Sequence, residues 1–137
     1  MGRTEQYVVG LLEKLLGPKD VRNRFEWAVG DVSPKTGRAA RLPFDAAWEE
    51  RKLIVEADED QHTEATPFFD KPDRITASGV HRGLQRRMYD ERKRRAARAQ
   101  GYKVVEIEWS RKRKPKADDI DELRRLLVVE GVLDRGR

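Results

Sequence analysis

The sequence predicts an α/β (α+β) fold with a mixed β-sheet of about four strands flanked by helices. Three observations support this class: apolar residues at helical spacing near both ends of the chain, short apolar runs typical of strands, and a long basic helix between two of those runs. The expected element order is α-β-β-β-α-β-α. A chain of 137 residues can bury one hydrophobic core. Because no internal repeat or composition change is visible, residues 1–137 are interpreted as one domain.

Three segments are predicted to be helical. Residues 4–16 carry valines and leucines at helical spacing, and Gly17-Pro18 ends the pattern. Residues 81–100 are predicted to form a basic helix that ends at Gly101. A final helix over about 118–130 has an apolar stripe, with Asp118 or Asp119 as its N-cap.

The strands are predicted from apolar and aromatic runs. Residues 21–29 and 102–109 each suit one strand, and residues 41–49 and 51–58 suit an antiparallel hairpin that turns near residues 49–51. Trp48, Trp109 and Tyr102 are assigned to the core. Residues 63–80 contain two prolines and no sustained period, which predicts a loop. Packing under this loop is favoured over DNA contact for Phe68 and Phe69.

Composition excludes several classes of protein. The chain has no cysteine, so disulfides and thiolate metal sites are excluded. Charges at Arg3, Glu5, Glu13 and Lys14 argue against a signal peptide, and no apolar run is long enough to span a bilayer. A cytoplasmic protein without a membrane partner is expected. The net charge of +5 favours a polyanionic partner, although it also fits plain solubility.

Carboxylates are concentrated where the 51–58 strand ends. Glu56 and Asp58 are two residues apart and share one face of an extended strand, and Asp45 on the preceding strand comes opposite one of them. Carboxylates crowded on one face repel each other unless a proton or a cation compensates them. Oxygen ligands suit Mg²⁺, for which Mn²⁺ can substitute. His62 follows as a candidate base, acid or ligand. The alternative is that the acidic run ending at His62 is a solvated turn.

Basic residues gather on the 81–100 helix and in the connector that follows the last strand. The candidate phosphate-binding residues are Arg82, Arg86, Arg87, Lys93, Arg94, Lys112 and Arg113. Acids at i,i+4 on the helix are too few to pair most of its arginines. The alternative is a solvated helix face. Together with the carboxylates, these cations point to phosphodiester chemistry on DNA.

A helix with an early Glu5, a strand carrying Asp45, then "VEADEDQH" and "YDERKRRAARAQGYKVVEIEW" together resemble the PD-(D/E)XK nuclease superfamily. The branch most similar contains very-short-patch-repair-like and EDxHD homing endonucleases. The resemblance covers about residues 4–110, the expected core, and implies a restriction-endonuclease-like fold.

The resemblance also implies roles for single residues. Asp45 matches the first metal-binding aspartate, Glu56 the acid of the second motif, and His62 the histidine of this branch. Asp58 stands where most members have a lysine, which puts a lysine-activated water in doubt. Two further acids match, Glu5 on the first helix and Asp90 on the later helix, and Glu59 replaces a common glycine.

These inferences predict a Mg²⁺-dependent DNA endonuclease or nickase, active in DNA repair, recombination or mobile-element and phage biology. The catalytic candidates are Glu5, Asp45, Glu56, Asp58, His62 and Asp90, and the metal candidates are Asp45, Glu56 and Asp58. The alternative from another class is a non-catalytic nucleic-acid-binding module on an inactive nuclease fold. A component of a larger repair assembly is a third possibility. The sequence leaves monomer and homodimer open.

Overall fold

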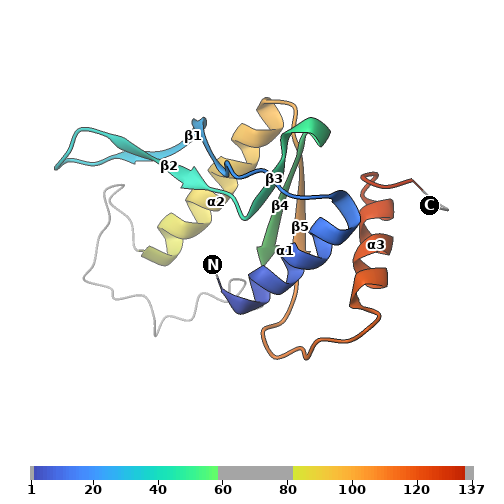
Figure 1. The fold of residues 1–137 in the computed structure, drawn as a ribbon. Helices are drawn as coiled ribbons and strands as arrows, with labels where there is room; N and C mark the ends of the chain where they lie inside the picture. The colour runs from blue at the N-terminus through green and yellow to red at the C-terminus, as the bar shows by residue number, and fades with distance from the viewer. Residues whose placement is uncertain (1, 59–81, 135–137) are drawn as a thin grey trace.

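The computed structural model describes residues 2–58 and 82–134, with only the backbone at residues 82 and 83. Three helices and two small sheets make up this part of the chain (Figure 1). The elements in order are α1 (Arg3–Leu16), β1 (Arg24–Val32), β2 (Ala39–Pro43), β3 (Ala46–Trp48), the 3-10 turn Glu49–Arg51, β4 (Leu53–Asp58), α2 (Arg82–Ala99), β5 (Lys103–Glu108) and α3 (Asp119–Val129). The mixed α and β class predicted from the sequence is confirmed.

The central sheet has three strands in the order β3-β4-β5. Strands β3 and β4 form the predicted antiparallel hairpin, in which Ala46 pairs with Val55 and Trp48 with Leu53. The 3-10 turn between them lies where the sequence predicted it, and Lys52 closes it with a left-handed backbone at φ 51°. Strands β4 and β5 pair in parallel. Because β3 runs against them, its first residue lies at the same edge as their carboxyl ends.

The prediction of one sheet with about four strands is wrong, and so is the count of three strands before the basic helix. The segment 41–49 is two strands, because the chain leaves one sheet at Pro43 and enters the other at Ala46. Proline has no N–H to donate to a ladder, which suits the end of β2. Between the strands the Phe44 N–H donates to the Asn23 carbonyl at 2.9 Å, and the Phe44 ring is buried. Strand β2 pairs with β1 in a separate two-stranded ribbon.

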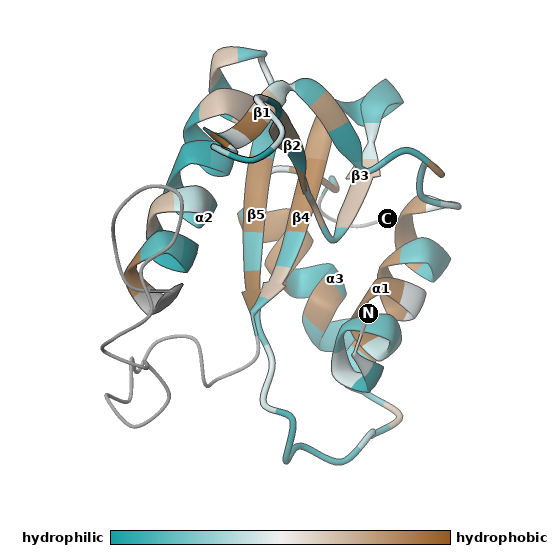
Figure 2. Ribbon diagram, turned by 90° about the vertical axis from the view of Figure 1, so that its left-hand side faces the viewer, coloured by the Kyte–Doolittle hydropathy of each residue, from teal (hydrophilic) through white to brown (hydrophobic). Residues whose placement is uncertain are grey.

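The two faces of the central sheet bury different clusters. Leu53 and Val55 face α1 and α3, whose valines and leucines complete the larger cluster. Ile54 faces the other side, where Phe25, Phe44 and the helix α2 cover it. Figure 2 shows that β4 and β5 are mostly hydrophobic whereas α2 is largely hydrophilic. The predicted core positions of Trp48, Trp109 and Tyr102 are confirmed, since all three are buried.

The start of α3 differs from the predicted cap. Asp118 occupies the N-cap position without a side-chain hydrogen bond. Asp119 is fully buried instead and accepts hydrogen bonds from the Tyr7 hydroxyl at 2.6 Å and from the Lys116 N–H at 2.8 Å. These bonds fix α3 and the connector before it against α1. None of the described helices has the length and the apolar character needed to cross a bilayer.

Candidate functional site

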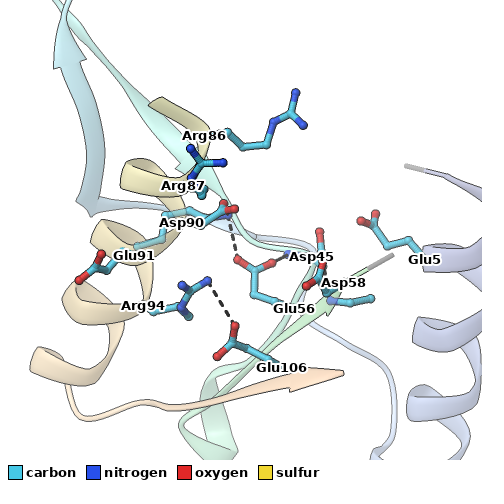
Figure 3. A pocket seen from close by; sticks show the side chains of 12 residues that line it. Glu5, Asp45, Glu56, Asp58, Arg86, Arg87, Asp90, Glu91, Arg94 and Glu106 are labelled. Atoms are coloured by element: carbon cyan, nitrogen blue, oxygen red, sulfur yellow. Dashed lines mark hydrogen bonds and ion pairs between the residues drawn. The ribbon is translucent and has the colours of Figure 1, made fainter. Parts of the chain in front are cut away.

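A polar pocket lies at the edge of the central sheet where β4 ends. Its volume is about 490 Å³. Helix α1 contributes its first turn, α2 its middle turns, β4 and β5 residues of their carboxyl-terminal halves, and Asp45 comes from the link before β3 (Figure 3). Seven carboxylates and four cations line it, and these are Glu5, Asp45, Glu56, Asp58, Asp90, Glu91 and Glu106, with Arg86, Arg87, Lys93 and Arg94. Thus a net acidic pocket is present in a chain of net charge +5.

Asp45 lies immediately before β3, one position beyond the Ala46–Val55 pair, and therefore faces Glu56. Its Oδ2 accepts the Ala57 N–H at 2.7 Å, and its own N–H donates to Glu56 Oε2 at 3.2 Å. Burial, together with the hydrogen bond and charge of Glu5, raises the pKa of Asp45 to about 6, while the hydrogen bonds from Ala57 and with Glu56 act in the opposite direction. The predicted approach of Asp45 to Glu56 is confirmed. A cation bound beside Asp45 would lower the pKa of this carboxyl and so restore its charged form.

Glu56 is largely enclosed in the pocket, with 13% of its side chain exposed. The Lys93 ammonium lies 2.8 Å from its Oε1, while its Oε2 accepts the Asp45 N–H. Burial raises the pKa of Glu56 to about 7; Lys93 opposes this rise and the charge of Asp45 adds to it. Both oxygens of Glu56 are therefore bound by donors of the protein itself.

Lys93 projects from α2 into this acidic cluster. Its ammonium donates to the Pro43 carbonyl at 2.8 Å and lies 3.6 Å from Asp90 Oδ1, and the residue is 9% exposed. A buried ammonium with these partners cannot reach the phosphate backbone of a duplex outside the pocket. We therefore assign Lys93 to the carboxylate cluster, a correction to the phosphate contact predicted from the sequence.

Two arginines on α2 stand at the mouth of the pocket. Arg86 and Arg87, called the mouth arginines below, are exposed and line it. Neither forms an ion pair within residues 2–58 and 82–134. Arg94 also lines the pocket but lies 3.3 Å from Glu106 on β5. The mouth arginines are thus the pocket cations best placed to meet an anion from solvent.

Two arginines of α2 pair with acids on neighbouring strands, which the i,i+4 pattern could not reveal. Arg92 pairs with Asp31 of β1 at 3.0 Å, and Arg94 pairs with Glu106. Arg95 pairs with Glu91 on the helix itself. Within the described part of α2, acids at i,i+4 therefore pair few of the arginines, as predicted, and two further partners come from strands that pack on the helix.

The connector between β5 and α3 contains the two remaining predicted phosphate-binding residues. Lys112 is exposed. Arg113 is engaged within the fold: it lies 2.7 Å from the buried Asp119, 2.8 Å from Glu122, and its guanidinium stacks 3.8 Å from the centre of the Trp109 ring. We therefore assign Arg113 to the α1–α3 junction, which corrects its predicted DNA contact. Neither residue lines the pocket.

The predicted acids Glu5, Asp45, Glu56, Asp58 and Asp90 all line one pocket. His62, Glu59, and the loop with Phe68 and Phe69 lie outside the described residues, as does the side chain of Arg82.

Sequence reasoning missed two pocket acids, Glu91 and Glu106. Glu106 is the parallel partner of Glu56. A parallel alignment of residues 53–58 with 103–108 would have found it.

The donor set fits a hard divalent cation. Asp45 and Asp58 present carboxylates to the pocket, and Glu5 points toward them from α1 (Figure 3). Within the described residues, no group of three or more His, Cys, Asp or Glu side chains forms a ready-made metal cage. Mg²⁺ is usually bound through one or two carboxylates together with water and substrate phosphate rather than by such a cage. Asp45 and Asp58 meet that requirement.

Comparisons with models of protein families, with curated proteins and with solved structures found no match to this chain.

Proposed function

We propose that the chain is a Mg²⁺-dependent DNA endonuclease or nickase of the PD-(D/E)XK type with a restriction-endonuclease-like core. The observation that carries this proposal is the juxtaposition in one pocket of Asp45, Glu56 and Asp58 with the mouth arginines. Acids that share a desolvated site need a compensating cation, and exposed arginines beside them favour a phosphate. Hydrolysis of a phosphodiester is the reaction that uses both features.

In this proposal Asp45 and Asp58 hold the cation, with Glu5 beside them. A bound Mg²⁺ would supply Lewis-acid stabilisation to the phosphate and favour ionisation of water. Lys93 holds Glu56 in place and favours its charged form. The Lys93 ammonium also places a positive charge in the pocket. In this chain Asp58 stands at the position where most members of the superfamily have a lysine. His62 remains the candidate for proton transfer.

The substrate contact is assigned to the mouth arginines. Each can donate two hydrogen bonds to one phosphate, which fixes the backbone but carries no base specificity. Lys112, exposed on the connector that leaves the same edge of the sheet through Trp109, extends the basic surface. A DNA duplex is the polyanion we propose for this surface.

Supercoiled plasmid incubated with Mg²⁺ or Mn²⁺ tests the proposal. The wild-type protein is expected to nick or linearise it, whereas Asp45→Asn and His62→Ala should abolish the reaction. Glu50→Gln is the matched control, because Glu50 is an exposed carboxylate at the opposite end of the β3–β4 hairpin. Cleavage at the wild-type rate by both site variants would exclude the mechanism.

A second candidate is a non-catalytic nucleic-acid-binding module. One contact favours it: the Lys93 ammonium already compensates Glu56, so the protein itself supplies part of the positive charge that the acids need. Thermal unfolding separates the two candidates. A metal-dependent enzyme should unfold at a higher temperature in Mg²⁺ or Mn²⁺, whereas an inactive module should not respond.

A further inference from the structure

The ribbon of β1 and β2 projects away from the central sheet (Figure 1). Its proximal half joins the core, where Phe25 and Ala28 are buried beside Phe44. Its distal half, from Val32 to Ala39, leaves the body of the protein, and residues 34–38 of the turn are all exposed. Two-stranded ribbons are only marginally stable alone. A projecting ribbon therefore needs contacts with the rest of the protein to stay folded, and we expect it to bind a partner.

Helix α2 provides these contacts. The Asp31 N–H donates to the Tyr89 hydroxyl at 2.9 Å, and the Asp31 carboxylate pairs with Arg92 at 3.0 Å. Gly30 permits this contact, because a Cβ there would lie 3.0 Å from the Tyr89 ring. Tyr89 and Arg92 therefore hold the ribbon, while Arg86, one turn earlier on the same helix, faces the pocket.

The turn of the ribbon is built before any partner binds. The Ser33 N–H donates to the Arg38 carbonyl at 2.9 Å and the Gly37 N–H to the Ser33 carbonyl at 2.8 Å. The side chains of Ser33 and Thr36 accept the N–H groups of Lys35 and Arg38. Gly37 adopts φ 69°, which favours glycine. A preformed turn loses little conformational entropy on binding.

The charged side chains of the distal ribbon are all basic. Residues 32–39 include Lys35 and Arg38 and no acid, and Arg41 follows on β2 opposite Val29. All three cations are exposed, and so is Val32, at 59%. An exposed apolar side chain beside exposed cations suits a surface that touches both phosphates and base edges.

The dimensions of the ribbon favour B-form DNA over A-form RNA as its partner. The major groove of B-form DNA is about 12 Å wide and about 8.5 Å deep and admits a two-stranded ribbon. Beyond Asp31 the chain continues through Val32, the last residue of β1, and Ser33 into the turn that begins at Pro34. Three residues of chain span at most about 10 Å, which is comparable to the depth of that groove. The deep, narrow major groove of A-form RNA does not admit such side chains.

We propose that the β1–β2 ribbon enters the major groove of duplex DNA and holds the duplex while the mouth arginines contact its backbone. Lys35 and Arg38 are the contacting residues, and α2 fixes the distance between the groove contact and the pocket. The proposal takes duplex DNA from the function proposed above and names the surface that recognises it.

Fluorescence anisotropy with labelled duplex DNA in EDTA tests the ribbon without cleavage. Lys35→Ala/Arg38→Ala is compared with Arg51→Ala/Lys103→Ala, a control that removes the same charge from exposed residues near the opposite edge of the sheet. Loss of two phosphate contacts should weaken binding about tenfold to thirtyfold at near-physiological salt and reduce the salt slope by about two. The control should bind within about twofold of the wild type.

Parallel titrations with single-stranded DNA and double-stranded RNA test the groove. The ribbon variant should lose more affinity for duplex DNA than for either. Three results would each overturn the proposal. These are an equal loss of affinity for all three polymers, duplex binding by the ribbon variant equal to that of the control variant, and no duplex binding by the wild-type protein. Ribbon-dependent duplex binding by a protein that fails to cleave DNA would support the ribbon contact and contradict the nuclease function.

Discussion

Replacing Asp45 by asparagine is expected to stabilise the metal-free protein while removing its proposed cation site. Asparagine keeps an oxygen for the Ala57 N–H, which Asp45 accepts at 2.7 Å, and its amide group can donate to the acids beside it. The substitution therefore removes a charge from a crowded site with little change in shape.

The size of the effect follows from the pKa of Asp45, which is raised from 3.8 to about 6. The folded state holds the proton more tightly than the unfolded state, so the energetic cost of the charge grows as pH rises from about 4 to about 6 and is complete above that range. Two pKa units correspond to about 3 kcal/mol. Because the carboxyl is partly exposed, solvent screening reduces this to about 1–2 kcal/mol.

Thermal unfolding followed by circular dichroism at pH 4.5 and pH 7.5, without divalent cations, measures the difference. At pH 7.5 the Asp45→Asn protein should unfold about 5 °C above the wild type, and at pH 4.5 the gap should close. Glu50→Gln, which changes an exposed acid, should match the wild type at both values. Added Mg²⁺ should raise the Tm of the wild type but not of Asp45→Asn. An Asp45→Asn protein that is no more stable than the wild type at pH 7.5 would refute the reasoning.

Three further substitutions test other contacts. Lys93→Met should raise the pKa of Glu56 above 7, so its loss of stability should grow from pH 6 to pH 8 and reach about 1–3 kcal/mol in urea denaturation; a loss independent of pH would contradict the ion pair. Arg113→Met should cost about 2 kcal/mol because it removes a donor from a fully buried aspartate, whereas Lys112→Met should leave stability unchanged; equal stabilities would contradict the assignment of Arg113. Alanine at both mouth arginines should reduce the salt slope of DNA binding by about two and leave a Mg²⁺-induced rise in Tm unchanged. Loss of that rise would show that these arginines help to hold the cation.

Local patterns predicted the helices and the turn of the hairpin well. Apolar spacing located α1 and α3 to within about two residues. The period of two and the hairpin turn placed Asp45 opposite Glu56 or Asp58, and the register of the structure selects Glu56. The break between β2 and β3 was missed, because residues 41–49 alternate as one strand would. The decisive contacts at that break are long-range: Phe44 packs on Phe25.

The sequence predicted the acidic residues of the candidate site better than its basic residues. Asp45, Glu56 and Asp58 could be placed from strand register, since neighbouring strands fix which residues meet, whereas Glu5 and Asp90 on the helices came from the family resemblance. The environment of Lys93 depends on how α2 lies over the sheet, and its burial beside Pro43 and Glu56 has no signature in a run of basic residues. The same holds for Arg92, whose partner Asp31 is distant in sequence.

Titration of free Mn²⁺ by electron paramagnetic resonance tests the central claim most directly, because it needs no knowledge of the DNA substrate. We expect one Mn²⁺ to bind per chain at pH 7.5, with at least about tenfold weaker binding by Asp45→Asn and wild-type binding by Glu50→Gln. Binding should weaken below about pH 6, since the proton that Asp45 holds competes with the cation. Mn²⁺ binding that is absent from the wild type, or equal in Asp45→Asn and the wild type, would contradict the central claim.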